Sequence, residues 1–181
     1  KKKGLMVMGI IYFLFFAGII AYGSYQAFSP VVRYDHVEVN KEADRDSLKI
    51  LMASDTHLGP IVGSGHLGKL ARIVEEEKPD IVLIPGDIID DQIDTFKEEN
   101  MIDIFSRMEP PLGVYMSPGN HDYYGDDLEE LEEELEDGGI HMLMDETKEI
   151  DGLYLVGRKD LTDDKRSSIK DLVEGLDQSK P

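Results

Sequence analysis

The sequence contains no cysteine, and basic residues are scarce beside acidic ones. Without cysteine, neither a disulfide framework nor a thiolate metal site can form. The 181 residues include 19 Lys and Arg against 38 Asp and Glu, which gives a formal net charge of −19. Non-specific binding to nucleic acid depends on neutralising phosphates with Lys and Arg, so this charge balance argues against a nucleic-acid partner. The chain also has no internal repeat and no low-complexity tail.

Charge is missing altogether from a long stretch near the N-terminus. After the three lysines at 1–3, residues 4–32 carry no charged side chain. A bilayer-spanning helix needs about 20 apolar residues, and residues 5–28 supply that length. We therefore predict a membrane anchor over residues 1–33, with the lipid bilayer as a partner. The alternative is a signal peptide, whose apolar part is only about 7–15 residues and ends at a small-residue cleavage site.

The flanking charges predict the orientation of this anchor in the cell membrane. Three lysines precede the apolar run, and only Arg33 follows it among mixed charges. Because basic residues favour the cytoplasmic side, we expect the rest of the chain to be extracytoplasmic, whether the helix is the single span or the last of several. Residues 31–39 then alternate apolar and polar, which predicts an edge strand. The region 34–47 is interpreted as that strand and a linker.

The remaining chain alternates short apolar runs with amphipathic segments. Ile81 to Ile84 are four consecutive apolar residues, typical of a strand buried on both faces of a parallel sheet, and Pro85 ends them. Similar strands are predicted at 48–53, 113–117 and 140–144, with helices at 66–78, 94–108, 126–137 and 167–176 and a hairpin at 147–156. This alternation predicts an α/β fold with a largely parallel sheet covered by helices.

Polar side chains follow three of these strands directly. Asp55 and His57 follow the first, Asp87 follows the second, and Asn120 follows the third. Open α/β sheets bind ligands beyond the carboxyl ends of their strands, so these groups should converge. No basic residue lies in the three turns, so the carboxylates imply a bound cation. Mixed oxygen and nitrogen ligands favour zinc or a transition metal over calcium. Any one of these residues taken singly is more typical of a turn or helix cap.

At these residues the chain resembles a known family. D-x-H at 55–57, G-D-x-x-D at 86–90 and G-N-H-D at 119–122 are similar, in order and spacing, to the first three blocks of the calcineurin-like metallophosphoesterases. The similarity covers residues 48–158, and the apolar N-terminus extends it to a membrane-anchored bacterial envelope branch. It implies a metallophosphoesterase-type α/β/β/α sandwich, incomplete in this chain and preceded by one transmembrane helix. Residues 48–181 would form the N-terminal part of that domain.

The resemblance also implies a set of metal ligands. Asp55, His57 and Asp87 would bind one divalent ion, and Asp87 and Asn120 the second, with Mn, Fe or Zn as the expected metals. Asp87 would bridge the pair, because two cations about 3.5–4 Å apart need a shared anionic ligand. A hydroxide bridging the metals would attack phosphorus, which makes a phosphoester the substrate and the protein a phosphohydrolase.

Two catalytic residues follow from the same resemblance. His121 would protonate the leaving oxygen as general acid, and Asp90 would orient it. Asp122 would support the ligands from behind. For Asp90 and Asp122 the helix-cap interpretation remains open. The histidines at 36, 66 and 141 lie outside the three blocks and are assigned no role.

One departure from the family pattern concerns the end of the chain. Related enzymes complete the site with later histidines in a Gly-His-x-His loop, but no histidine follows His141. We therefore expect this 181-residue chain to be nearly inactive alone. The function predicted for the whole protein is hydrolysis of a phosphodiester or pyrophosphate bond, on an envelope or lipid-linked substrate. The alternative is a non-catalytic membrane-anchored binding module that keeps the fold.

Overall fold

The computed structural model of the protein describes residues 2–41 and 43–181, which form two compact units divided after Asp35. In the first unit, helix α1 (Lys2–Ala27) is apolar over nearly its whole length, and none of its side chains is buried. Its length and composition are those of a membrane span. The predicted anchor also includes Lys1, which lies outside the described residues.

The edge strand predicted over residues 31–39 does not form. This segment has no regular secondary structure, and Val31 and Val37 are 81% and 78% exposed. Alternation of apolar and polar residues favours a strand only where a neighbouring strand supplies hydrogen bonds and a core takes up the apolar face. Neither is provided here, so the alternating pattern alone was misleading.

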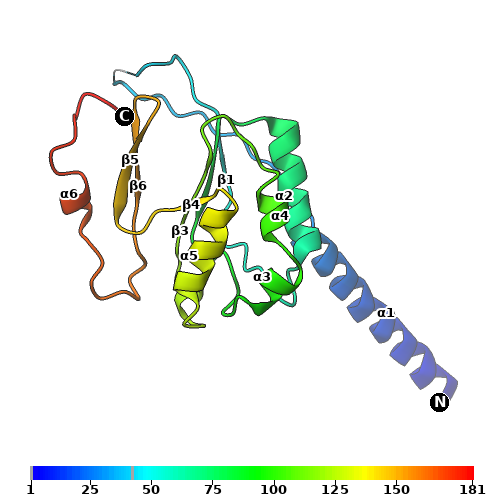
Figure 1. Cartoon of the computed structure of the whole chain (residues 1–181). Coiled ribbons are helices and arrows are strands. Elements are labelled where there is room, and N and C mark those ends of the chain that lie inside the picture. The colour runs from blue at the N-terminus through cyan, green and yellow to red at the C-terminus, as the bar shows by residue number, and fades with distance from the viewer. Residues whose placement is uncertain (1, 42) are drawn as a thin grey trace. The chain divides into compact units, whose positions relative to one another are not determined.

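The second unit is built on a four-stranded parallel sheet, as the sequence predicted (Figure 1). Its strands are β1 (Ile50–Met52), β2 (Ile81–Pro85), β3 (Val114–Ser117) and β4 (His141–Met142), in that spatial order. All three strand pairs are parallel. The carboxyl ends of β1, β2 and β3 therefore meet at one edge, and the turns that follow them are neighbours.

Helices cover one face of this sheet. Helices α2 (Ser64–Glu77) and α5 (Leu128–Asp137) confirm two of the predicted helices. The prediction of a single helix over residues 94–108 is wrong. The structure has two short helices there, α3 (Asp94–Glu98) and α4 (Ile102–Phe105). The break falls at Asn100, whose φ of 50° lies in the left-handed region that a continuing helix excludes. Phe96 and Phe105, one on each piece, still stack at 6.0 Å in the core.

The two faces of the sheet belong to different cores, because side chains alternate along each strand. Val82, Ile84 and Met116 pack with the helices, whereas Ile81 and Tyr115 pack on the opposite face. That second face is covered by an antiparallel hairpin, β5 (Glu146–Ile150) and β6 (Leu153–Gly157). Its turn at residues 151–152 has positive φ at both positions, which matches the right-handed twist of a two-residue hairpin.

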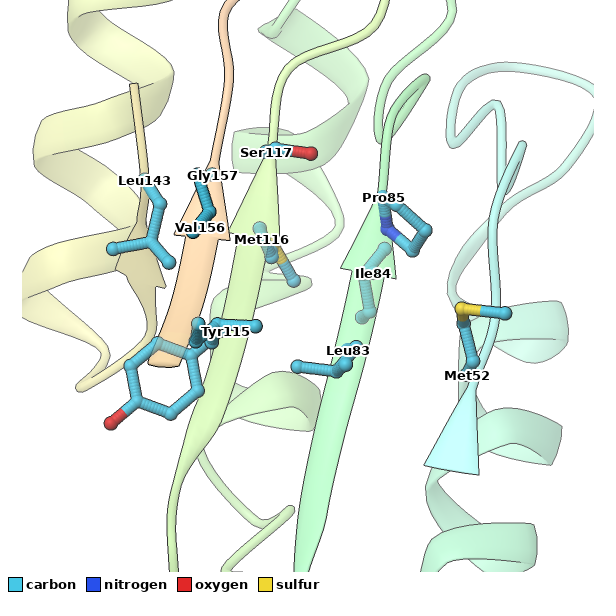
Figure 2. Close-up of a pocket in the computed structure, with 11 residues that line it drawn as sticks. Met52, Leu83, Ile84, Pro85, Tyr115, Met116, Ser117, Leu143, Val156 and Gly157 are labelled. Atoms are coloured by element: carbon cyan, nitrogen blue, oxygen red, sulfur yellow. The ribbon is translucent and has the colours of Figure 1, made fainter. Parts of the chain in front are cut away.

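The hairpin covers this second face only in part. The resulting cavity has a volume of about 180 Å³. Figure 2 shows residues that line it, among them Met52 and Leu83 of the parallel sheet and Val156 and Gly157 of β6. Met52 remains 69% exposed. The layers are thus helices, parallel sheet and hairpin, which is consistent with the expected sandwich. Beyond the hairpin, among the described residues, only the four-residue helix α6 (Ile169–Leu172) contributes to an outer helical layer.

Candidate metal centre

The turns that follow β1 and β2 are hydrogen-bonded to each other along their length. The N–H groups of residues 55, 57 and 58 donate to the carbonyls of residues 86, 87 and 88, at 3.2, 3.0 and 2.9 Å. The Thr56 hydroxyl adds a bond of 2.9 Å to the carbonyl of Ile88. The two turns therefore hold each other in place, and the side chains of the first are set against those of the second.

Three of the predicted ligands lie on strained backbone in these turns. Asp55, His57 and Asp87 have φ values of 54°, 42° and 51°. The left-handed region costs a non-glycine residue roughly 1–2 kcal/mol. Such strain persists where surrounding contacts over-determine the conformation, and it clusters at functional sites. Here the paired turns supply those contacts, and the strain aims three side chains at one point.

Asp55, His57 and Asp87 come together as the sequence predicted. Each offers one ligand atom, and these three atoms lie within 4.8 Å of one another. Nε2 of His57 is 3.7 Å from the Asp87 carboxylate. Two carboxylates at this separation repel each other unless a positive charge lies between them. Two carboxylate oxygens and one imidazole nitrogen form a donor set that fits Mn, Fe or Zn.

The turn after β3 completes the same edge by packing directly on Asp87. The N–H of His121 donates to Oδ1 of Asp87 at 2.9 Å. A Cβ added to Gly119 would overlap the carboxylate and backbone nitrogen of Asp87, so only glycine permits this approach. Asn120 then lines an open cavity of about 400 Å³ together with Asp55 and Asp87.

Asn120 is oriented by a tyrosine that the sequence interpretation missed. Its Nδ2 donates to the Tyr124 hydroxyl at 2.7 Å. An amide binds a cation through its oxygen, so engaging the nitrogen elsewhere leaves the oxygen for the metal. Tyr124 lies one turn after Asn120, past the short 3-10 helix η1 (His121–Tyr123).

Replacing Tyr124 with phenylalanine should weaken cation binding without unfolding the domain. Loss of such a supporting hydrogen bond typically costs about 10–100-fold in metal affinity. The Mn²⁺ concentration for half-maximal activity should rise accordingly, while turnover at saturating Mn²⁺ changes little. Tyr154→Phe, on the hairpin, is the matched control. An unchanged Mn²⁺ dependence in Tyr124→Phe would show that the tyrosine does not orient Asn120.

A second cluster joins His57, Asp90 and His121, whose potential ligand atoms also lie within 4.8 Å. Nδ1 of His121 is 3.3 Å from Asp90 and 3.1 Å from Asp91. Asp90 is thus near His121, as expected, but Asp91 is closer and was not anticipated. The rings of His57 and His121 meet edge to face with centroids 4.5 Å apart. His121 is therefore contacted through Nδ1 by two carboxylates, which leaves Nε2 for another partner.

Asp122 lies behind the ligands and is fully buried. Its carboxylate accepts the N–H groups of Ile88, Ile89 and Gly119 at 2.9, 3.0 and 2.8 Å. Burial raises the pKa of Asp122, although these three bonds act in the opposite direction. The side chain ties the β2 turn to the β3 turn, so it supports two ligand-bearing loops at once.

Three basic residues share the cavity, and the sequence interpretation missed all of them. Arg158 and Lys159 follow β6, and Arg166 comes later in the same loop. No local pattern marked them, because the hairpin brings them to the site from a separate sheet. The turns after β1, β2 and β3 contain no basic residue, as noted from the sequence, but the tertiary structure brings positive charge to them.

Comparisons with known proteins agree with this geometry. The sequence pattern of the Calcineurin-like phosphoesterase family matches residues 48–177. A Danio rerio protein, named transmembrane protein with metallophosphoesterase domain, is 37% identical over 130 residues, covering 70% of this chain and 29% of its own length. A metallophosphoesterase of Aquifex aeolicus is 30% identical over 141 residues, covering 78% and 53%.

The chain therefore spans only about a third to a half of the length of these relatives. The matched region nevertheless includes the whole parallel sheet, the three ligand-bearing turns and the hairpin that carries the basic residues. Since both the pattern and the placement of its residues agree, this chain belongs to the calcineurin-like phosphoesterase family.

Proposed function

We propose that the protein is a metal-dependent phosphohydrolase whose centre is the carboxyl edge of the parallel sheet. In this proposal Asp55, His57 and Asp87 hold one divalent cation, and Asp87 and Asn120 hold a second. The observation that supports it most strongly is the convergence of Asp55, His57 and Asp87 within 4.8 Å from two separate strands. When bound, such cations lower the pKa of a water and offset charge on the phosphoryl oxygens.

His121 is the proposed general acid. Its Nδ1 faces Asp90 and Asp91, whose carboxylates accept the Nδ1–H and hold the ring in one orientation. As general acid the ring must carry a second proton on Nε2, which it would donate to the leaving oxygen of the substrate, returning to the neutral Nδ1–H form. Asp87 contributes to the same arrangement, since its Oδ1 accepts the His121 N–H and so fixes the start of η1.

Hydrolysis of a generic phosphodiester tests this proposal. The full-length protein, purified without metal, should cleave bis-p-nitrophenyl phosphate when Mn²⁺ is added and lose that activity in EDTA. The 181-residue chain alone should be much less active, because Asp87 and Asn120 are then the only proposed ligands of the second cation. Metal-independent turnover, or none with any divalent cation, would contradict the assignment.

The proposed substrate is a phosphodiester or pyrophosphate at the cell envelope, including lipid-linked compounds. Helix α1 supports membrane anchoring, and the Danio rerio relative is itself named a transmembrane protein. An enzyme anchored in this way meets substrates in or near the bilayer. The three N-terminal lysines favour a cytoplasmic N-terminus and an extracytoplasmic domain.

The lack of cysteine makes the proposed topology directly measurable. Glu133→Cys places a single thiol on the exposed face of α5, and Gly4→Cys places one at the start of α1. A membrane-impermeant maleimide should label Glu133→Cys in intact cells or spheroplasts. It should reach Gly4→Cys only after permeabilisation. The reverse pattern would place the domain in the cytoplasm.

A further inference from the structure

The metal-type ligands occupy only part of the 400 Å³ cavity, and another part of its lining is basic. Arg158, Lys159 and Arg166 line it together with Asp55, Asp87 and Asn120. We call these three basic residues the basic wall. Asp160 lines the cavity as well, so three positive side chains face three carboxylates there, in a chain with a net charge of −19. Positive charge is therefore concentrated at the basic wall relative to the rest of the chain, and such a local concentration attracts anions.

The loop that carries the basic wall is held in place from both ends. Asp145 accepts the N–H groups of Lys159 and Ser167 at 3.1 and 2.7 Å. The Arg158 guanidinium donates twice to the Ser167 carbonyl, from Nε at 3.0 Å and Nη2 at 2.8 Å. Within the loop, Asp160 accepts the N–H and hydroxyl of Thr162. An anion bound here would meet a preorganised surface, which reduces the entropic cost of binding.

The three side chains of the basic wall differ in their salt-bridge partners. Lys159 pairs with Asp163 at 2.8 Å. Neither Arg158 nor Arg166 forms a salt bridge among residues 2–41 and 43–181, although the charge of Arg166 acts on Asp160. Nε of Arg166 is buried without a hydrogen-bond partner in the same residues. A buried unsatisfied donor is unfavourable unless something supplies an acceptor. The guanidinium fork matches two oxygens of a phosphate or carboxylate.

We propose that Arg158 and Arg166 bind a second anionic group of the substrate, distinct from the phosphoryl group that is hydrolysed. The inference rests on the proposed function, which places the reacting phosphoryl group at Asp55, Asp87 and Asn120. Divalent cations there already supply the positive charge which that group needs, and a guanidinium at the same point would repel them. The cavity is also far larger than one phosphate. The substrate class is thus a phosphoester with a neighbouring oxyanion, such as a second phosphate.

Arg166 is the residue to change, because Arg158 also holds the loop closed. Calorimetry on the full-length protein in EDTA should detect orthophosphate binding, and Arg166→Gln should weaken it about tenfold, the loss expected for one charge-assisted hydrogen bond. Arg166→Lys should restore part of the affinity. The matched control is Arg107→Gln, which removes one exposed positive charge at the opposite, amino-terminal edge of the sheet. Thermal unfolding verifies that each variant is folded.

Kinetics then identify which group the wall holds. With Mn²⁺, Arg166→Gln should raise KM about tenfold for a P1,P2-diester of pyrophosphate, which carries two anionic groups. KM for bis-p-nitrophenyl phosphate, which carries one, should stay unchanged. An equal rise in KM for both substrates would mean that the basic wall holds the reacting phosphoryl group. An unchanged KM for both would mean that the basic wall has only a structural role. Either result overturns the inference. Orthophosphate binding without any hydrolysis would instead count against the proposed function alone.

Discussion

Replacing Asp87 with asparagine should reduce Mn²⁺-dependent phosphodiester hydrolysis by at least about 10²–10³-fold, the loss typical of removing one preorganised electrostatic group. Asp87 is the proposed bridging ligand, so the change removes negative charge from both cation sites at once. Asparagine keeps an oxygen at the position that accepts the His121 N–H at 2.9 Å. The β3 turn should therefore stay in place, and the loss should be electrostatic rather than structural. Activity and bound manganese are both measured, and both should fall.

Asp137→Asn is the matched control for this experiment. Asp137 is the exposed last residue of α5, and the chain then enters β4 at the amino-terminal edge of the sheet. The control removes the same charge far from the ligand-bearing turns and should leave activity and manganese content unchanged. If Asp87→Asn retained wild-type turnover with its metal bound, Asp87 would not be the bridging ligand.

Replacing Asp122 with alanine should destabilise the domain by about 3–5 kcal/mol, because two buried backbone N–H groups and one partly buried one lose the carboxylate that accepts them. These donors belong to Ile88 and Ile89 in the turn after β2 and to Gly119 in the turn after β3. Alanine also leaves a small void in a fully buried position. Urea unfolding of the detergent-solubilised protein, followed by circular dichroism, measures the change. The measurement is made in EDTA so that metal binding does not contribute.

Asparagine at the same position provides the graded comparison. Its oxygen can still accept from Ile88 and Ile89, but its amide nitrogen would face the Gly119 N–H, donor against donor. The loss should be about 1–3 kcal/mol, the cost of one unsatisfied buried donor and smaller than for alanine. Asp137→Ala, at an exposed site, should change stability by less than about 0.5 kcal/mol. Equal stability of Asp122→Ala and wild type would show that the turns do not depend on this carboxylate.

The strands and the ligand-bearing turns could be predicted because their signals are local. Ile81 to Ile84 are apolar throughout and β-branched at three positions, and Pro85 follows them. Neighbouring residues therefore predict both the strand and the position where it ends. Strands that are parallel bring their carboxyl ends together, so Asp55, Asp87 and Asn120 were expected at one edge without knowledge of any contact. The hairpin turn at Asp151 and Gly152 was likewise visible as a local dipeptide signal.

Other features depended on partners that local patterns do not reveal. Residues 31–39 alternate like a strand but have no neighbouring strand, and the predicted helix over 94–108 breaks at Asn100. Asp91, one position after Asp90, has a left-handed backbone with a φ of 68° and lies closer to Nδ1 of His121, which adjacent sequence positions did not indicate. In each case tertiary contacts between residues distant in the sequence override the local preference of the segment.

The amino-acid sequence by itself determined the chemical character of the site: an apolar N-terminal span, an acidic chain without thiols, and carboxylate, imidazole and amide groups at three strand ends. Only the tertiary structure decided what surrounds that site. It buried Asp122 beneath two turns, set Tyr124 against Asn120, and brought Arg158 and Arg166 from a separate hairpin into the same cavity. The physical reason is that strand ends follow from short-range periodicity, whereas a cavity wall is assembled from residues distant in the chain, whose approach depends on packing.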